Sequence, residues 1–224
     1  MRLFAGLGNP GPKYARNRHN VGFMAVERIA ADHGFGPWRA RFRGEVAEGR
    51  LGSHKVLLLK PLTFMNLSGE SVREALGFYK LDSAALTVFH DELDLPPGRM
   101  KFKQGGGHAG HNGLRSIEAH VGREFARVRI GIGHPGAREK VTGWVLGDIP
   151  RAEEGLFDEV LHAISQGATA LAAGDGARFG TILATRLSSP ATDAATPARP
   201  AEAPPSDKPD PPLSPLQRLI ERFR

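Results

Sequence analysis

Short apolar runs at four places along the chain predict β-strands. Residues 2–7 are apolar after the first residue and end among glycines, as a buried strand does where it enters a loop. Residues 56–59 and 86–89 are β-branched and apolar runs of buried-strand length. Residues 127–132 alternate basic and apolar side chains, and this period of two predicts a half-exposed strand.

Three longer stretches have the spacing of helices that bury one face. Residues 21–33 repeat apolar side chains at helical intervals, with Asn20 as the expected N-cap. Residues 68–81 follow the same period, with Ser68 as a possible cap, and residues 152–173 predict a long helix after Pro150. Strands that alternate with helices predict an α/β fold with a partly parallel sheet.

The composition changes at Ser188. Nine of the 17 prolines lie in residues 188–215, mixed with Ala, Ser, Thr and Asp, so this stretch has too little apolar surface to order itself. We therefore expect one domain over residues 1–187 and a disordered linker over residues 188–212. Residues 213–224 have apolar side chains at roughly helical spacing, which predicts a short amphipathic segment that folds only against the body of the domain, a partner or an anionic surface. The alternative is a frayed tail whose periodicity is accidental. The sequence does not identify that partner.

Composition and charge exclude several classes of protein. No apolar run approaches the roughly 20 residues of a membrane-spanning helix, so we expect no membrane span. The absence of cysteine removes disulfides, thiolate catalysis and Cys-based zinc sites, and it fits a reducing cytoplasm. The net charge is +6, and the tail from Ser188 is neutral, with five basic and five acidic residues. A compact body with the whole basic excess predicts affinity for polyanions.

Four segments rich in glycine or asparagine interrupt the predicted elements, at residues 6–11, 63–69, 90–98 and 105–113. Each segment lies where a strand or helix should end. Ligands of open α/β sheets bind beyond the carboxyl ends of the strands. We therefore expect the four segments to meet at one rim of the sheet.

The first segment matches a dinucleotide-binding fingerprint only in part. Gly6, Gly8 and Gly11 have the required spacing after a predicted strand, but Pro10 and Pro12 flank the third glycine. No acidic residue ends a second strand about 20 residues further on. The sequence therefore predicts no nicotinamide cofactor.

His19 is a candidate general base, since it stands between a basic loop and the first predicted helix. A carboxylate bonded to one imidazole nitrogen would fix the tautomer and leave the other nitrogen to take a proton from water. Asp91 follows the strand that ends at Phe89, so its carboxylate should emerge at the rim of the sheet. Glu92 and Asp94 are competing carboxylates that the sequence does not exclude.

Two other chemistries have weaker support. His108 and His111 stand three residues apart among glycines, but no motif of helical metal-ligand spacing accompanies them, so we expect no metal. Ser68 lies outside a Gly-x-Ser-x-Gly elbow, which makes a nucleophilic serine a poor candidate. A water molecule activated by a base is the simplest hydrolytic mechanism that remains.

Basic residues cluster beside three of the glycine- and asparagine-rich segments. Such side chains contact phosphates without reading nucleotide sequence. A solvated face explains any one cluster, but three clusters beside three candidate site segments favour a phosphate-binding surface. The clusters are Arg16 and Arg18; Arg99, Lys101 and Lys103; and Arg123, Arg127 and Arg129.

Four strings resemble the signature segments of bacterial-type peptidyl-tRNA hydrolases: GLGNPGPKYARNRHNVGF, KPLTFMNLSGESV, FHDELDLPPGRMKFKQGGGHAGHNGLRSI and RVRIGIGHPG. They occur in the family's order, and the resemblance covers residues 3 to about 187. It implies a single α/β domain with a twisted, mixed sheet flanked by helices. The activity that it implies is a metal-independent and cofactor-free hydrolysis of the ester between a peptide and the 3′ ribose of tRNA. We also expect a monomer in the cytoplasm.

The resemblance implies roles for individual residues. His19 corresponds to the general base, Asp91 to the partner that holds its basic form, and Asn9 to the residue that senses the acylated amino group. Positions that contact substrate match Tyr14, Phe64, Asn66 and Asn112, and positions that grip tRNA phosphates match Lys101, Lys103 and Arg129. A second hypothesis is an inactive RNA-binding or RNA-processing relative of the same fold. The retention of His19, Asp91, Asn9 and Asn112 argues against it.

Overall fold

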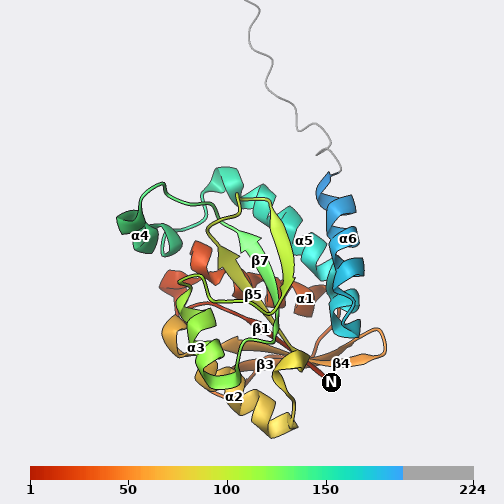
Figure 1. Ribbon diagram of the computed structural model, residues 1–224. Coiled ribbons are helices and arrows are strands. Elements are labelled where there is room, and N and C mark those ends of the chain that lie inside the picture. Colours follow the sequence, from red (N-terminus) through yellow and green to blue (C-terminus); the bar gives the residue numbers. More distant parts are fainter. Residues whose placement is uncertain (189–224) are drawn as a thin grey trace, which may run out of the picture. The chain divides into compact units, whose positions relative to one another are not determined.

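The computed structural model describes residues 1–188, and these residues form one compact α/β unit (Figure 1). The predicted α/β fold with a mixed, partly parallel sheet is confirmed. The predicted linker beyond Ser188 and the predicted amphipathic segment, residues 213–224, lie outside the described residues.

A seven-stranded sheet has the order β2-β3-β4-β1-β5-β7-β6. The four neighbours β4, β1, β5 and β7 run parallel, whereas β3, β2 and β6 pair antiparallel at the two edges. The carboxyl ends of the four parallel strands therefore meet at one rim. The strands are β1 (Arg2–Gly6), β2 (Arg39–Arg41), β3 (Gly44–Leu51), β4 (His54–Pro61), β5 (Leu86–Glu92), β6 (Met100–Gln104) and β7 (Ala126–Gly131).

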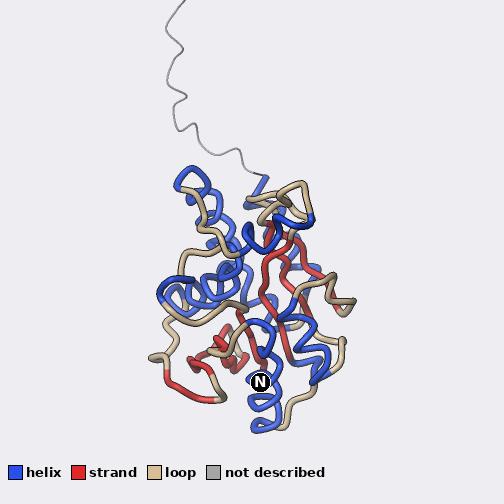
Figure 2. The backbone as a smooth tube through the Cα atoms, turned by 90° about the vertical axis from the view of Figure 1, so that its left-hand side faces the viewer, coloured by secondary structure: helices blue, strands red, loops and turns tan. Residues whose placement is uncertain are grey.

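Helices lie on both sides of the strands (Figure 2). One face packs on α1 (Val21–Asp32), α5 (Arg151–Ala173) and α6 (Gly176–Ser188), and the other face packs on α2 (Ser68–Tyr79) and α3 (Asn112–Val121). The short α4 (Val141–Val145) follows the last strand. Successive strand residues alternate between the two layers, since Phe4 packs in one core and Leu3 and Ala5 in the other. None of the described helices has the length and hydropathy to cross a membrane.

Several elements were not predicted from the sequence: β2, β3, β6, α3, α4 and α6. The two edge strands β2 and β6 have mostly exposed side chains, so their hydrophobic pattern is weak. The start of α3 at Asn112 lies inside the glycine-rich stretch, where composition favours a loop. These elements form because they pair or pack with the core, which a local pattern does not record.

Two local predictions are wrong, and a third is right only in position. Strand β7 is not half-exposed, because Arg127 is only 2% exposed beneath the carbonyls of Gly106 and Gly107. Ser68 does not cap α2, because the N-cap residue is Leu67. Asn20 is the N-cap residue of α1, as predicted, but its side chain makes no capping hydrogen bond. The Asn20 side chain bonds to the main chain of Asn9, and the Ser68 hydroxyl donates to the Met65 carbonyl.

Helix α1 begins in backbone contact with the sheet at Gly22. A Cβ atom at this position would lie 2.3 Å from the Phe89 carbonyl oxygen and 2.4 Å from the Leu7 amide nitrogen. From the strand side, a Cβ at Gly6 would lie 2.2 Å from the Gly22 carbonyl oxygen. Glycine is required at both positions because the approach is closer than any side chain permits. This contact fixes the turn that carries His19 at the rim of the sheet.

We predict that Gly22→Ala lowers the free energy of unfolding by about 1–3 kcal/mol, since an inserted methyl group must push α1 away from β1 and β5. Gly155→Ala is the matched control, because Gly155 lies in α5 and a Cβ added there would meet no atom within 4 Å. That change should raise stability by about 0.5–1 kcal/mol through helix propensity. Denaturant unfolding measures both, and equal effects would contradict the close-packing argument.

Candidate active site

A cavity of about 650 Å³ opens at the rim where the parallel strands end. Asn9 follows β1, Asn66 follows β4, and Asp91 lies near the end of β5. Asn112, at the start of α3, closes a further side. The predicted convergence of the four segments at one rim is therefore correct. The opposite wall comes from α4 and the residue after it, through Val141, Thr142, Val145 and Leu146.

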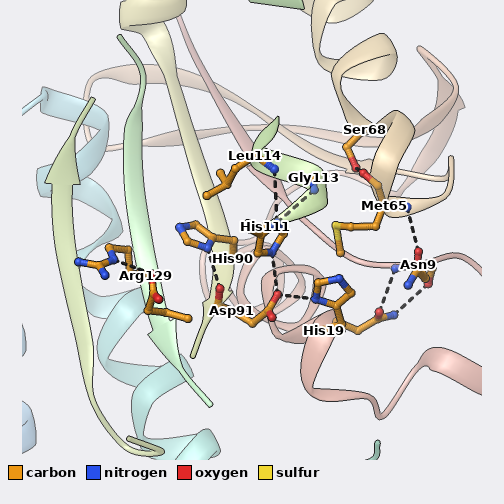
Figure 3. Close-up of polar contacts among 12 residues, drawn as sticks. Asn9, His19, Met65, Ser68, His90, Asp91, His111, Gly113, Leu114 and Arg129 are labelled. Carbon is orange, nitrogen blue, oxygen red and sulfur yellow. Dashed lines mark hydrogen bonds and ion pairs between the residues drawn. The ribbon is translucent and has the colours of Figure 1, made fainter. Parts of the chain in front are cut away.

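His19 and Asp91 form a buried hydrogen-bonded pair. Nδ1 of His19 lies 2.8 Å from Oδ1 of Asp91, and the two residues are 8% and 4% exposed (Figure 3). An ionised carboxylate only accepts hydrogen bonds, so the proton of neutral His19 is on Nδ1. The Nε2 lone pair is then free to accept a proton. The sequence left three carboxylates open as the partner of His19, and the structure shows that it is Asp91. The carboxylate of Glu92 binds Arg129 instead.

His111 makes a second hydrogen bond to the same carboxylate oxygen of Asp91. This role of His111 was not predicted from the sequence. Its Nε2 lies 2.9 Å from Oδ1 of Asp91, and its ring centroid is 5.0 Å from that of His19 (Figure 3). The backbone N–H groups of Gly113 and Leu114 donate to its Nδ1. His111 therefore caps α3 with one nitrogen and supports Asp91 with the other. The His-x-x-His spacing singled it out, but for metal chemistry.

The tautomer of His111 argues against a metal at this cluster. His19, Asp91 and His111 each offer a ligand atom, and these atoms lie within 4.8 Å of one another. Since Nδ1 of His111 accepts two N–H groups, its proton must be on Nε2, the atom that a metal would need. Among the described residues, His108 is not part of this cluster, and its Nδ1 accepts from the amide of Gly110. The residues fit a hydrogen-bonded carboxylate better than an ion.

The charges in the cluster shift the pKa values of its members. Burial favours the neutral form of Asp91, but the charges and hydrogen bonds of His19 and His111 outweigh it, and the pKa of Asp91 lies well below its usual value. Burial also lowers the pKa of His19, but the charge and hydrogen bond of Asp91 prevail and raise it above 6.5. Burial, followed by the His111 charge, lowers the pKa of the neighbouring His90 to about 3. His90 is therefore neutral at physiological pH.

Asn9 is oriented by hydrogen bonds of its side chain and its main chain. Its side-chain Oδ1 accepts from the Met65 amide at 2.9 Å (Figure 3). Its own amide nitrogen and carbonyl oxygen bond to the Asn20 side chain at 2.9 and 3.0 Å. Because Oδ1 already has a partner, the amide orientation is fixed and the NH₂ group is the free donor beside the cavity. The roles of Asn20 and Met65 were not predicted, since they depend on how the folded chain brings these residues to Asn9.

The remaining predicted residues divide into three groups. Phe64, Asn66 and Asn112 line the cavity, and Phe64 is 60% exposed at its edge. Tyr14 does not line the cavity; it lies on the loop between β1 and His19, where Lys13 covers its ring. The three predicted phosphate contacts, Lys101, Lys103 and Arg129, lie outside the cavity on β6 and β7.

Four cations share one face of the β6–β7 pair. In the antiparallel register, Lys101 is opposite Arg129, and Lys103 is opposite Arg127. Residues directly opposite each other project from the same face, and like charges there are destabilising. The other face of the pair carries Phe102 and Val128 toward α5 and α6. Glu92 neutralises Arg129 in part, at 2.7 Å. Arg127 is buried, so the other three cations form the part of this face that suits anion binding.

The fold and the site together define an α/β protein whose cavity presents a histidine with a free nitrogen, an arrangement suited to hydrolysis, with basic side chains on β6 and β7 outside the cavity. Comparisons with known proteins specify the family. The family model for peptidyl-tRNA hydrolase matches residues 3–186, and the chain belongs to this family.

Relatives and solved structures agree with this assignment. The peptidyl-tRNA hydrolase of Ruegeria pomeroyi is 61% identical over all of both chains, and that of Dinoroseobacter shibae is 56% identical over all of both chains. The crystal structure of peptidyl-tRNA hydrolase from Acinetobacter baumannii is similar with a TM-score of 0.78 and 43% identity. That match covers 82% of this chain and 94% of the other.

We predict that NMR titration of the histidines finds the pKa of His19 above 6.5 and that Asp91→Asn brings it below 6.5. The substitution removes the negative charge that raises the pKa, while burial, which lowers it, remains. His90 is the internal control, since it should not titrate above about pH 3 in either protein. An unchanged His19 pKa in the variant would mean that Asp91 does not control its protonation.

Proposed function

We propose that the protein hydrolyses the ester that joins a peptide to the 3′-terminal ribose of tRNA, which returns the tRNA to translation. The observation that carries this proposal is the buried Asp91 carboxylate that leaves Nε2 of a cavity histidine, His19, free as a base. Membership of the peptidyl-tRNA hydrolase family supports the choice of ester. No residue of the proposed pathway requires a metal or cofactor.

His19 is the general base of the reaction. Its Nε2 takes a proton from water as the water oxygen attacks the ester carbonyl, and negative charge develops on the carbonyl oxygen. Asp91 stays ionised and stabilises the imidazolium that forms. When the tetrahedral intermediate collapses, the imidazolium returns the proton to the departing ribose oxygen, so the products are a free carboxyl group and tRNA. Two asparagines of the cavity wall, Asn66 and Asn112, supply amide N–H groups for the oxyanion.

Asn9 selects substrates with a blocked amino group. Its free NH₂ group donates to the carbonyl of the peptide bond that precedes the ester-linked residue. An ordinary aminoacyl-tRNA has a free ammonium group and no carbonyl at this place. A donor on the protein would then face a donor on the ligand, so the enzyme spares aminoacyl-tRNA.

The cationic face of β6 and β7 binds the tRNA backbone. Lys101, Lys103 and Arg129 contact phosphates, and the exposed Phe64 ring stacks on a base at the acceptor end. The half-buried Tyr14 contacts substrate from the loop before His19. We further propose that the protein acts as a monomer in the cytoplasm, where its substrate forms and where a chain without cysteine needs no oxidising environment.

The decisive experiment is turnover of an N-blocked aminoacyl-tRNA by the purified protein. We expect His19→Ala to reduce kcat by about 10²–10⁴-fold, the typical contribution of a positioned general base. Arg28→Ala, on the outer surface of α1, is the control and should retain full activity. A wild-type chain that binds the substrate without cleaving it would favour the inactive RNA-processing alternative.

A second prediction concerns the cationic face. Lys103→Ala should raise KM for full-length peptidyl-tRNA and reduce its salt dependence by about one counterion, because one phosphate contact is lost. A minimal substrate without the body of the tRNA should be cleaved as before. Lys55→Ala is the matched control, since Lys55 is an exposed lysine near the start of β4, at the rim opposite the cavity. Equal losses on both substrates would instead assign Lys103 to the active site.

A further inference from the structure

Arg127 joins the buried strand β7 to the glycine-rich segment that leads to His111. Its guanidinium donates to the carbonyl oxygens of Gly107, at 2.6 Å, and of Gly106. The amide of Gly105 donates to the Phe125 carbonyl at 3.0 Å, so the segment is attached at two points to the start of the same strand. Arg127 is 2% exposed, which places both of its bonds beneath the surface.

Burying an arginine to hold a loop carries a large desolvation penalty. Within residues 1–188, no carboxylate lies within ion-pair distance of Arg127. Glu118 and Glu124 attract its charge from further away, whereas Arg123 and Arg129 repel it. Burial accordingly lowers the pKa of its guanidinium. An apolar side chain of similar volume would avoid the desolvation of a charge. The charged side chain is therefore explained by its hydrogen bonds to the two loop carbonyls. Without Arg127 these carbonyls would lose their donor.

Only three residues separate this attachment from His111. Ala109 and Gly110 have positive φ angles of 45° and 82°, and the amide of His111 donates to the His108 carbonyl at 2.8 Å. Because this turn is tight, a displacement of its first residue, His108, also displaces its last residue, His111. His111 in turn reaches Asp91 through Nε2 and caps α3 through Nδ1. A shift at Gly107 would therefore move the hydrogen bond on which the charge state of Asp91 depends.

We propose that Arg127 is a positioning residue for catalysis, which holds the segment 105–111 so that His111 supports Asp91. The proposal rests on the proposed function for its kinetic consequences, but not for its structural ones. Although Arg127 lies on the cationic face beside Lys103 and Arg129, it acts on the chemical step and contacts no phosphate. Substitution of Arg127 should therefore change kcat, whereas substitution of Lys103 should change KM.

The experiment compares Arg127→Lys with Lys103→Ala on full-length N-blocked aminoacyl-tRNA and on a minimal N-blocked aminoacyl ester of a short CCA oligonucleotide. Arg127→Lys keeps the charge but loses the paired donors. We expect kcat to fall by about 10-fold or more on both substrates, since a small displacement of a catalytic group costs up to about 10²-fold. The salt dependence should not change. Lys103→Ala should affect only the full-length substrate, and only through KM.

Histidine ¹⁵N NMR supplies a readout that needs no activity. In the wild-type protein, His111 should be a single tautomer with its proton on Nε2, and Arg127→Lys should give a mixture of tautomers. Gly106→Ala approaches the same contact from the loop, because its φ of 103° is strained for alanine, but its Cβ would also lie 2.8 Å from the end of the Lys103 side chain. If Arg127→Lys does not fold, Gly106→Ala should therefore reproduce both effects on the minimal substrate, which does not depend on Lys103. Losses confined to full-length tRNA, or an unchanged His111 tautomer with unchanged kcat, would overturn the proposal. If the wild-type protein itself cleaved neither substrate, the proposed function would be contradicted instead.

Discussion

The site depends on one buried carboxylate, Asp91. A charge removed from water is unstable unless hydrogen bonds replace its hydration, and Asp91 receives two from imidazole rings, one before it and one after it in the chain. Each histidine is thereby restricted to a single tautomer. His19 becomes a base directed at the cavity, and His111 becomes both a donor to Asp91 and the cap of α3. One ionised group thus specifies the protonation of the whole cluster.

The scaffold supports this carboxylate by close backbone packing rather than by large side chains. Gly6 and Gly22 allow α1 to begin against β1 and β5, and this contact places His19 next to Asp91. On the other side, Arg127 fixes the path of the glycine-rich segment to His111. The two histidines are therefore held by different layers of the fold. Asp91, near the end of the interior strand β5, is the point where these layers meet.

Much of the fold and part of the site could be predicted from the sequence. The apolar runs of β1, β4 and β5 and the amphipathic helices α1, α2 and α5 are local signals, and they predicted the architecture. The pair of His19 with Asp91 could be proposed because both stand at the ends of predicted elements. The bonds of Asn20 to Asn9 and of His111 to Asp91 depend on tertiary approach, which no local pattern encodes. The prediction that β7 is half-exposed was wrong for the same reason. A charged residue such as Arg127 in a strand indicates exposure unless its buried hydrogen-bond acceptors are known.

The placement of the cationic face on an edge hairpin, outside the cavity, has a consequence for the catalytic cycle. Under the proposed function, contacts of Lys101 and Lys103 with the tRNA backbone would be the same before and after the ester is cleaved, so they would constitute uniform binding. They concentrate the substrate without lowering the barrier, and they also retain the product. Tight binding of deacylated tRNA would slow its release, and the ion pair with Glu92 reduces the charge that Arg129 offers to a phosphate. In such a cycle, weaker binding of the released tRNA would favour turnover.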